Sequence, residues 1–202
     1  MYLGIIPNIK SKYTIMKTLS FASTSNNSLA DILLKKLRTF RALPVILCIG
    51  SDRITGDCLG PLCGHLLVNV YNTPCYIYGT LDIPVTAKNL KSTLDFIKIR
   101  HPNQKIWAID ACVGKPQDVG IIKIGSGLYP GSYLGHSLPR SGNLGITACV
   151  ASDNDNDFQT ARLGNVFKLA DTIAQALDKS LRIHVSLQKI YQPSTNIIPA
   201  SN

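Results

Sequence analysis

Short apolar runs alternate with segments of helical periodicity through the middle of the chain, and this alternation constrains the fold more than any other feature. Residues 44–49, 75–78 and 105–109 form three such runs, each bounded by polar or turn-forming residues. Continuous apolar runs of this length are typical of strands buried on both faces, as in a parallel sheet. The order strand, helix, strand, helix, strand indicates right-handed crossover units. The sequence therefore predicts an α/β fold with a mostly parallel, doubly wound sheet.

The remaining elements are predicted from the same patterns. Pro61 suits the first position of a helix, where its missing N–H costs nothing, and this would leave Asp57 free in the preceding loop. Residues 181–190 alternate in polarity, which leaves an edge strand and a terminal helix both open. Helices are expected at residues 29–40, 61–70, 87–97 and 163–177, with caps at Asn27 or Ser28, Gly60, Thr86 and Asp157, and further strands at 120–124 and 144–150.

The formal net charge of +9 is carried by the two ends of the chain. Residues 1–41 hold seven Lys or Arg and one Asp, residues 179–202 hold three basic residues and no acid, and the stretch between them is neutral. Basic ends of this kind are typical of solvated extensions, so nucleic acid is not the expected partner. We expect an N-terminal extension (1–26), a single α/β domain (27–180) and a C-terminal tail (181–202).

The cysteines and the hydropathy exclude several classes of protein. None of the six cysteines forms a C-x-x-C pair, which speaks against a zinc ribbon and a secreted disulfide scaffold. We expect reduced, mostly buried thiols and a cytoplasmic protein. No apolar run reaches the roughly 20 residues that a membrane helix requires, and the N-terminus lacks the pattern of a secretory signal. A membrane partner is therefore not expected.

Two aspartates are predicted to face each other across the sheet. Ligands of doubly wound sheets bind beyond the carboxyl ends of the strands, at the point where the strand order reverses. If residues 44–49 lie between residues 75–78 and residues 105–109, that reversal lies between the first and third strands. Asp57 follows the first strand and Asp110 ends the third. Such a pair could act as acid and base around a water, bind a metal ion, or hold loops and helix ends in place.

Other groups near this point are weaker candidates. The glycine-rich loop after residue 49 lacks the Gly-Lys-Ser/Thr of a phosphate-binding loop and the spacing of a dinucleotide site, and Asp57 would repel phosphate. Cys112 has no histidine nearby in sequence and is interpreted as a packing residue. His136 lies in a glycine-rich segment and could supply a third metal ligand or a proton shuttle.

Five ordered motifs within residues 43–178 resemble the YyaC-type sporulation proteins. The motifs are Gly50-Ser-Asp-Arg-Ile-Thr-Gly-Asp-Cys-Leu-Gly-Pro61, Tyr78-Gly-Thr-Leu-Asp82 with Pro84-Val85, Ile109-Asp-Ala-Cys112 with Gly114, Tyr129-Pro-Gly131 with Leu138-Pro139 and Gly142, and Gln159-Thr-Ala-Arg-Leu163. That family is similar to the spore germination protease and, more distantly, to the hydrogenase maturation endopeptidases. The resemblance implies their fold, a three-layer α/β/α sandwich.

The resemblance also implies a peptidase acting in the interior of the forespore or spore. The catalytic aspartates of the germination protease fall on Asp57 and Asp110, and the hydrogenase endopeptidases place metal ligands at the same two positions and a histidine later. Asp52, Thr55 and Gly56 would contact a protein or peptide substrate. We expect no cofactor, although a divalent metal held by Asp57, Asp110 and His136 is an alternative. A second alternative is a non-catalytic peptide-binding or regulatory protein whose basic ends are contact arms.

Overall fold

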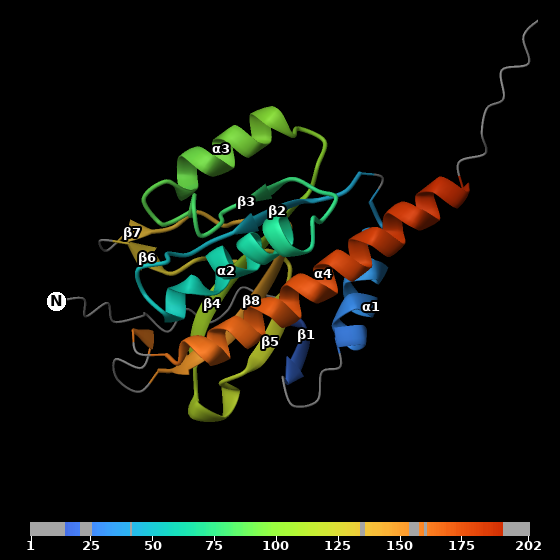
Figure 1. The fold of residues 1–202 in the computed structure, drawn as a ribbon. Helices are drawn as coiled ribbons and strands as arrows, with labels where there is room; N and C mark the ends of the chain where they lie inside the picture. The colour runs from blue at the N-terminus through green and yellow to red at the C-terminus, as the bar shows by residue number, and fades with distance from the viewer. Residues whose placement is uncertain are drawn as a thin grey trace, which may run out of the picture.

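A six-stranded sheet forms the centre of the fold in the computed structural model (Figure 1), with the strand order β1-β5-β8-β4-β2-β3. The structure describes residues 15–20, 26–40, 42–133, 136–153, 158–159 and 161–191. The strands of this sheet are β1 (Ile15–Ser20), β2 (Val45–Cys48), β3 (Ile77–Tyr78), β4 (Ile106–Gly114), β5 (Ile121–Gly125) and β8 (Leu144–Ser152). A separate hairpin pairs β6 (Ser132–Tyr133) with β7 (His136–Ser137).

The sheet is mostly parallel, as predicted. β3, β2, β4 and β8 are parallel neighbours, whereas β5 runs antiparallel to both β8 and β1. β2 lies between β3 and β4, so the predicted order of the first three core strands is confirmed. The strand order therefore reverses between β2 and β4, which is the point where a doubly wound sheet binds its ligands.

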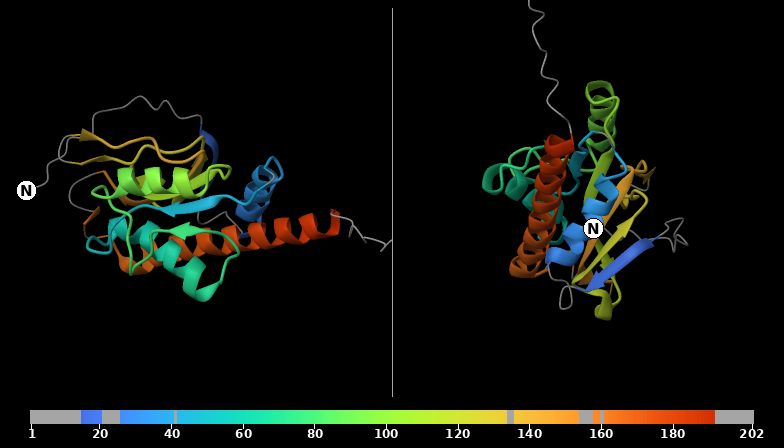
Figure 2. Two further views of the ribbon diagram at one scale, coloured as in Figure 1. Left: turned by 90° about the horizontal axis from the view of Figure 1, so that it is seen from above. Right: turned by 90° about the vertical axis from the view of Figure 1, so that its right-hand side faces the viewer.

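Helices cover both faces of the sheet (Figure 2). α1 (Asn26–Leu37), α2 (Leu59–His65) and α4 (Leu163–Tyr191) lie on one face, and α3 (Leu90–Arg100) lies on the other. The strands alternate between these two environments, as their period of two requires. Ile46 and Cys48 of β2 point to the face of α4, whereas Val45 and Leu47 point to the face of α3.

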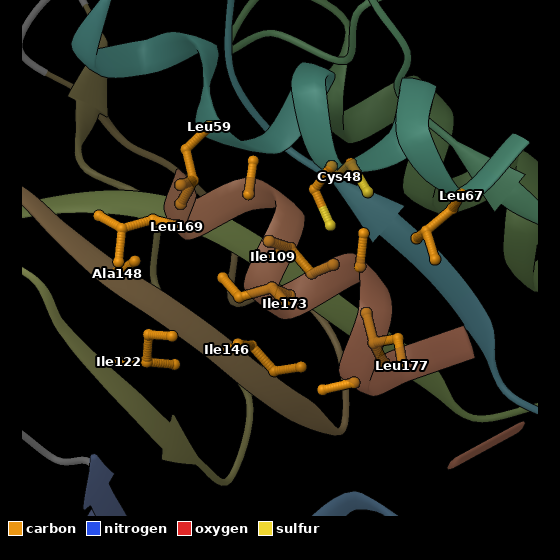
Figure 3. Close-up of a cluster of buried hydrophobic side chains, with 14 of the residues drawn as sticks. Cys48, Leu59, Leu67, Ile109, Ile122, Ile146, Ala148, Leu169, Ile173 and Leu177 are labelled. Atoms are coloured by element: carbon orange, nitrogen blue, oxygen red, sulfur yellow. The ribbon is translucent and has the colours of Figure 1, made fainter. Parts of the chain in front are cut away.

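The larger core cluster lies between α4 and the sheet. Figure 3 shows Leu169, Ile173 and Leu177 of α4, which meet Ile109 and Ile146 of the central strands. These positions on α4 are four residues apart and make one apolar face. The helix continues through residues 181–191, so the segment whose alternation was ambiguous is helical and crosses the predicted boundary at residue 180.

Several element boundaries differ from the prediction. The helix expected from residue 87 begins at Leu90, because Val85 still pairs with Ile49 and Asn89 closes a turn on Thr86. α2 begins at Leu59, two residues before Pro61, because a 3₁₀ turn over Gly56–Cys58 leads directly into it. The chain then passes from α2 into a π-helical turn over Leu66–Val70.

Near the N-terminus, the structure contains a strand that the sequence did not predict. Residues 15–20, inside the polar extension, form the edge strand β1. The cap expected at Asp157 lies outside the described residues. No helix in the described part of the chain combines the length and the apolar character needed to cross a bilayer.

Candidate active site

Asp110 lies on β4 at the point where β2 ends. The last residue of β2, Cys48, is in register with Ile109, so Asp110 is the first residue of β4 without a neighbour on that side. The prediction that the strand ends at Asp110 is wrong: β4 continues to Gly114 because β8 pairs with it along this whole length. Asp110 is buried, with 9% of its surface exposed, and its Oδ1 accepts a hydrogen bond of 2.9 Å from the Ala111 amide.

Asp57 lies in the loop that follows β2. The Ser51 amide donates to the Asp57 carbonyl oxygen at 3.1 Å, which folds the loop back on itself. Gly50 is required at the base of this loop, because its φ is +142° and a Cβ there would lie 2.0 Å from the Asp57 carbonyl oxygen. Asp57 makes no capping bond to α2. The Asp57 side chain is half-buried, and it is not engaged in capping the helix.

The two carboxyl groups influence each other electrostatically. Burial raises the pKa of Asp110 well above its ordinary value, and the nearby charge of Asp57 raises that pKa further. Burial also raises the pKa of Asp57 to about 6, while the Ser51 backbone amide acts in the opposite direction. Both carboxyls therefore keep their protons to a higher pH than an exposed aspartate does.

Three residues of the same loop were predicted to contact a substrate. Asp52 is exposed, Thr55 is half-buried and Gly56 is buried. A Cβ on Gly56 would lie 2.3 Å from the Phe158 carbonyl oxygen, so this glycine lets the segment after β8 approach the loop closely. The backbone after β3 approaches from the other side, where the Gly50 amide donates to the Val85 carbonyl oxygen at 2.9 Å.

The predicted third metal ligand, His136, cannot be placed beside this pair from the described side chains. His136 belongs to β7, but its side chain lies outside the described part of the structure. The β6–β7 hairpin lies at the end of the molecule where α2 begins (Figure 1 and Figure 2). Within the residues that the structure describes, no group of three or more His, Cys, Asp or Glu side chains could hold a metal ion.

Two polar residues that were not predicted from the sequence lie on the same row of the sheet as Asp110. Thr147 of β8 is in register with Asp110, and Lys123 of β5 is in register with Thr147. Because residues in register project from the same face, the three side chains form a polar row across three strands. Each is a polar position within an otherwise apolar strand, and this was the available signal. Its meaning depends on a register that the sequence does not reveal.

Comparisons with known proteins give one family and one relative. Residues 18–176 match the model of a family described as "Protein of unknown function (DUF1256)". The chain is also 39% identical over 151 residues to the "Uncharacterized protein YyaC" of Bacillus subtilis (strain 168), covering 72% of this chain and 74% of that protein. The resemblance to YyaC-type proteins is thereby confirmed. These comparisons do not include a peptidase.

Proposed function

Since the chain belongs to the DUF1256 family, whose description assigns no activity, we propose from its own residues that it is a peptidase in which Asp57 and Asp110 activate water. One observation carries the proposal: two carboxyls from different elements, with raised pKa values, lie close enough that the charge of Asp57 acts on Asp110. Perturbed carboxyl pairs at the strand reversal of an α/β sheet are typical of acid–base sites.

The environments of the two groups suggest separate roles. Asp57 is half-buried, and a carboxyl with a pKa of about 6 is mostly ionised at neutral pH, so it would take a proton from water. Asp110 is buried deeper, and both burial and the charge on Asp57 keep it protonated to higher pH. It would donate its proton to the oxygen of the scissile carbonyl. The pair thus supplies a base and an acid around one water molecule.

The fold and the surrounding loop are part of the same proposal. A mostly parallel sheet with helices on both faces is compatible with the three-layer sandwich of the hydrogenase maturation endopeptidases. Asp52, Thr55 and Gly56 would line the approach of an extended peptide to Asp57, beside the segment that contains Phe158. We place the protein in the interior of the forespore or spore, with residues 27–180 as its catalytic body. A metal ion remains outside the proposal, because the described donors near the pair are two carboxyls.

The test uses isosteric variants of the full chain. Asp57→Asn and Asp110→Asn keep the shape of each side chain but remove its acid–base chemistry, and each should slow cleavage by about 10²–10⁴-fold. The chains are incubated with proteins extracted from spores, and new N-termini are counted by mass spectrometry. Asp82→Asn, on the exposed loop after β3, is the matched control and should cleave at the wild-type rate.

Two results would count against this proposal. Undiminished cleavage by both variants would refute the role of the pair. Retained binding of the spore proteins without any cleavage by the wild-type chain would instead favour the non-catalytic, peptide-binding protein. Deleting residues 1–14, which precede the edge strand β1, then shows whether the basic N-terminal segment recruits the partner.

A further inference from the structure

Two cysteines lie side by side on neighbouring strands just beyond Asp110. Cys112 of β4 and Cys149 of β8 are in register in a parallel pair, so their side chains project from the same face. Neighbouring strands lie about 4.7–4.9 Å apart, which is within the Cα separation of 4.4–6.8 Å that disulfides need. The two thiols are close enough for each to shift the pKa of the other, and no disulfide joins them in the structure.

The backbone around these thiols holds them in close contact. A Cβ on Gly114 would lie 3.1 Å from the Cys149 Sγ, so the glycine leaves room for the sulfur. The Cys149 Sγ donates to the Ala151 carbonyl oxygen at 3.4 Å. The register of β4 and β8 shifts immediately after Cys112, where Val150 is an extra residue on β8 and forms a β-bulge beside the pair.

A lysine gives this pair an electropositive neighbour. Lys123 of β5 lies 3.8 Å from Asp118, and both side chains are about one-third exposed. Hydrogen bonding to Cys112, helped by Lys123, lowers the pKa of Cys149, whereas burial and the charge of Asp118 oppose this effect. The same hydrogen bond raises the pKa of Cys112, and burial and the charge of Asp110 act in that direction as well. One thiolate in the pair is therefore stabilised by the other thiol and by a cation.

The other thiol pair of the protein has different surroundings. Cys48 and Cys63 are completely buried between β2 and α2, within the larger apolar cluster. A hydrogen bond to Cys63, together with burial, raises the pKa of Cys48 well above its ordinary value. Burial also raises the pKa of the nearby Cys75 to about 12. The raised pKa values keep the thiols of Cys48 and Cys75 protonated, whereas the pair on β4 and β8 contains one thiol of lowered pKa, the buried Cys149, beside the half-buried Cys112.

We propose that Cys112 and Cys149 form an oxidisable dithiol, a modification site at which hydrogen peroxide produces an intramolecular disulfide between β4 and β8. In the first step one thiolate attacks a peroxide oxygen, the O–O bond breaks, and a sulfenic acid and hydroxide form. The second sulfur then attacks the sulfenic sulfur, and its proton leaves with the OH group as water. The two sulfurs lose two electrons in total, and the peroxide is reduced to two molecules of water. This site stands whether or not the Asp pair is catalytic.

The experiment measures the disulfide directly in the folded, full-length chain. The protein is treated with hydrogen peroxide, quenched, denatured with an alkylating reagent and digested without reduction. We expect a linked peptide pair containing Cys112 and Cys149 that has lost two hydrogen atoms, and four free thiols out of the six in the chain. Recovery of all six thiols, or links that involve Cys48, Cys63 or Cys75 as often, would overturn the proposal.

Three variants separate this site from general oxidation. Cys149→Ser should abolish the linked peptide, while Cys63→Ser, which removes a thiol from the buried pair, should form it at the wild-type rate. Lys123→Gln should form it several-fold more slowly, because the thiolate loses its neighbouring cation. Equal rates for Lys123→Gln and the wild type would remove Lys123 from the site, and loss of the link in Cys63→Ser would contradict the pairing.

Discussion

The two halves of strand β4 show how one element can serve both the core and the site. Residues 106–109 pair with β2 on one side, residues 107–109 also pair with β8 on the other, and all four residues are buried. From Asp110 to Gly114 the strand keeps only β8, and most of its residues are half-buried. The side chains change at the same place, from Trp107 and Ile109 to Asp110 and Cys112. Reactive groups thus begin where a neighbouring strand ends, since that is where a buried strand regains access to solvent.

The largest expected effect is in the core half of the strand. Trp107 is fully buried, so Trp107→Ala should lower the free energy of unfolding by about 3–5 kcal/mol. Urea unfolding followed by circular dichroism measures this. Trp107→Phe is the control and should cost much less, because the indole Nε1 has no hydrogen-bond partner to lose. Equal losses in the two variants would mean that this half of β4 depends on more than apolar packing.

The next largest loss of stability is expected in the loop that contains Gly56 and Asp57, beside the candidate site. Gly56→Ala places a methyl group against the Phe158 carbonyl oxygen and should destabilise the protein by about 1–3 kcal/mol, with a parallel loss of any cleavage. Gly131→Ala is the matched control, because nothing lies within 4 Å of the position that a Cβ would take there. If the two variants unfold at the same urea concentration, the close approach of the two segments is not required.

In residues 110–114 of β4, the half that carries the candidate site, a substitution should raise the free energy of unfolding and not lower it. Folding at neutral pH must either bury the Asp110 charge or bind a proton, so Asp110→Asn should raise the free energy of unfolding by about 1–2 kcal/mol. Asp31→Asn, on an exposed position of α1, should change it by less than about 0.5 kcal/mol. Destabilisation by Asp110→Asn would show that the carboxylate supports the fold, and the contrast between the two halves would then fail.

The smallest effect is a dependence on pH. The folded pKa of Asp57, about 6, lies above the ordinary value of 3.8, so the folded state binds more protons between these values. Its contribution to stability therefore grows as pH falls from 7 towards 4. Relative to Asp57→Asn, the wild type should gain about 1 kcal/mol or less over this range, because solvent screens a half-buried group. Parallel stability curves for the two chains would indicate an unperturbed carboxyl.

Much of the arrangement of the sheet could be predicted from the sequence. The apolar runs at residues 44–49 and 105–109 are strands buried on both faces, and the order assumed for the first three strands is the one that the structure has. Because parallel strands end at one edge of the sheet, this order was sufficient to bring Asp57 and Asp110 to the same region. The choice of Asp57 and Asp110 as a candidate pair rested on this assumed order and on the motif resemblance.

What the sequence could not provide depends on contacts between distant segments. The start of α3 is delayed because Val85 pairs with Ile49, and no local pattern reveals this. β4 extends beyond Asp110 because β8 is long enough to pair with it. The proximity of Cys112 and Cys149 likewise depends on the register of β4 with β8, so both cysteines looked like ordinary packing residues.

The packing of α1 against α4 has a consequence for synthesis on the ribosome. α1 is synthesised before the parallel strands of the sheet, whereas α4, which covers it, follows the last of them. The same delay applies to β1, whose partner β5 follows about halfway along the chain. The nascent helix α1 must therefore expose its apolar face to solvent or to chaperones until α4 has emerged from the ribosome.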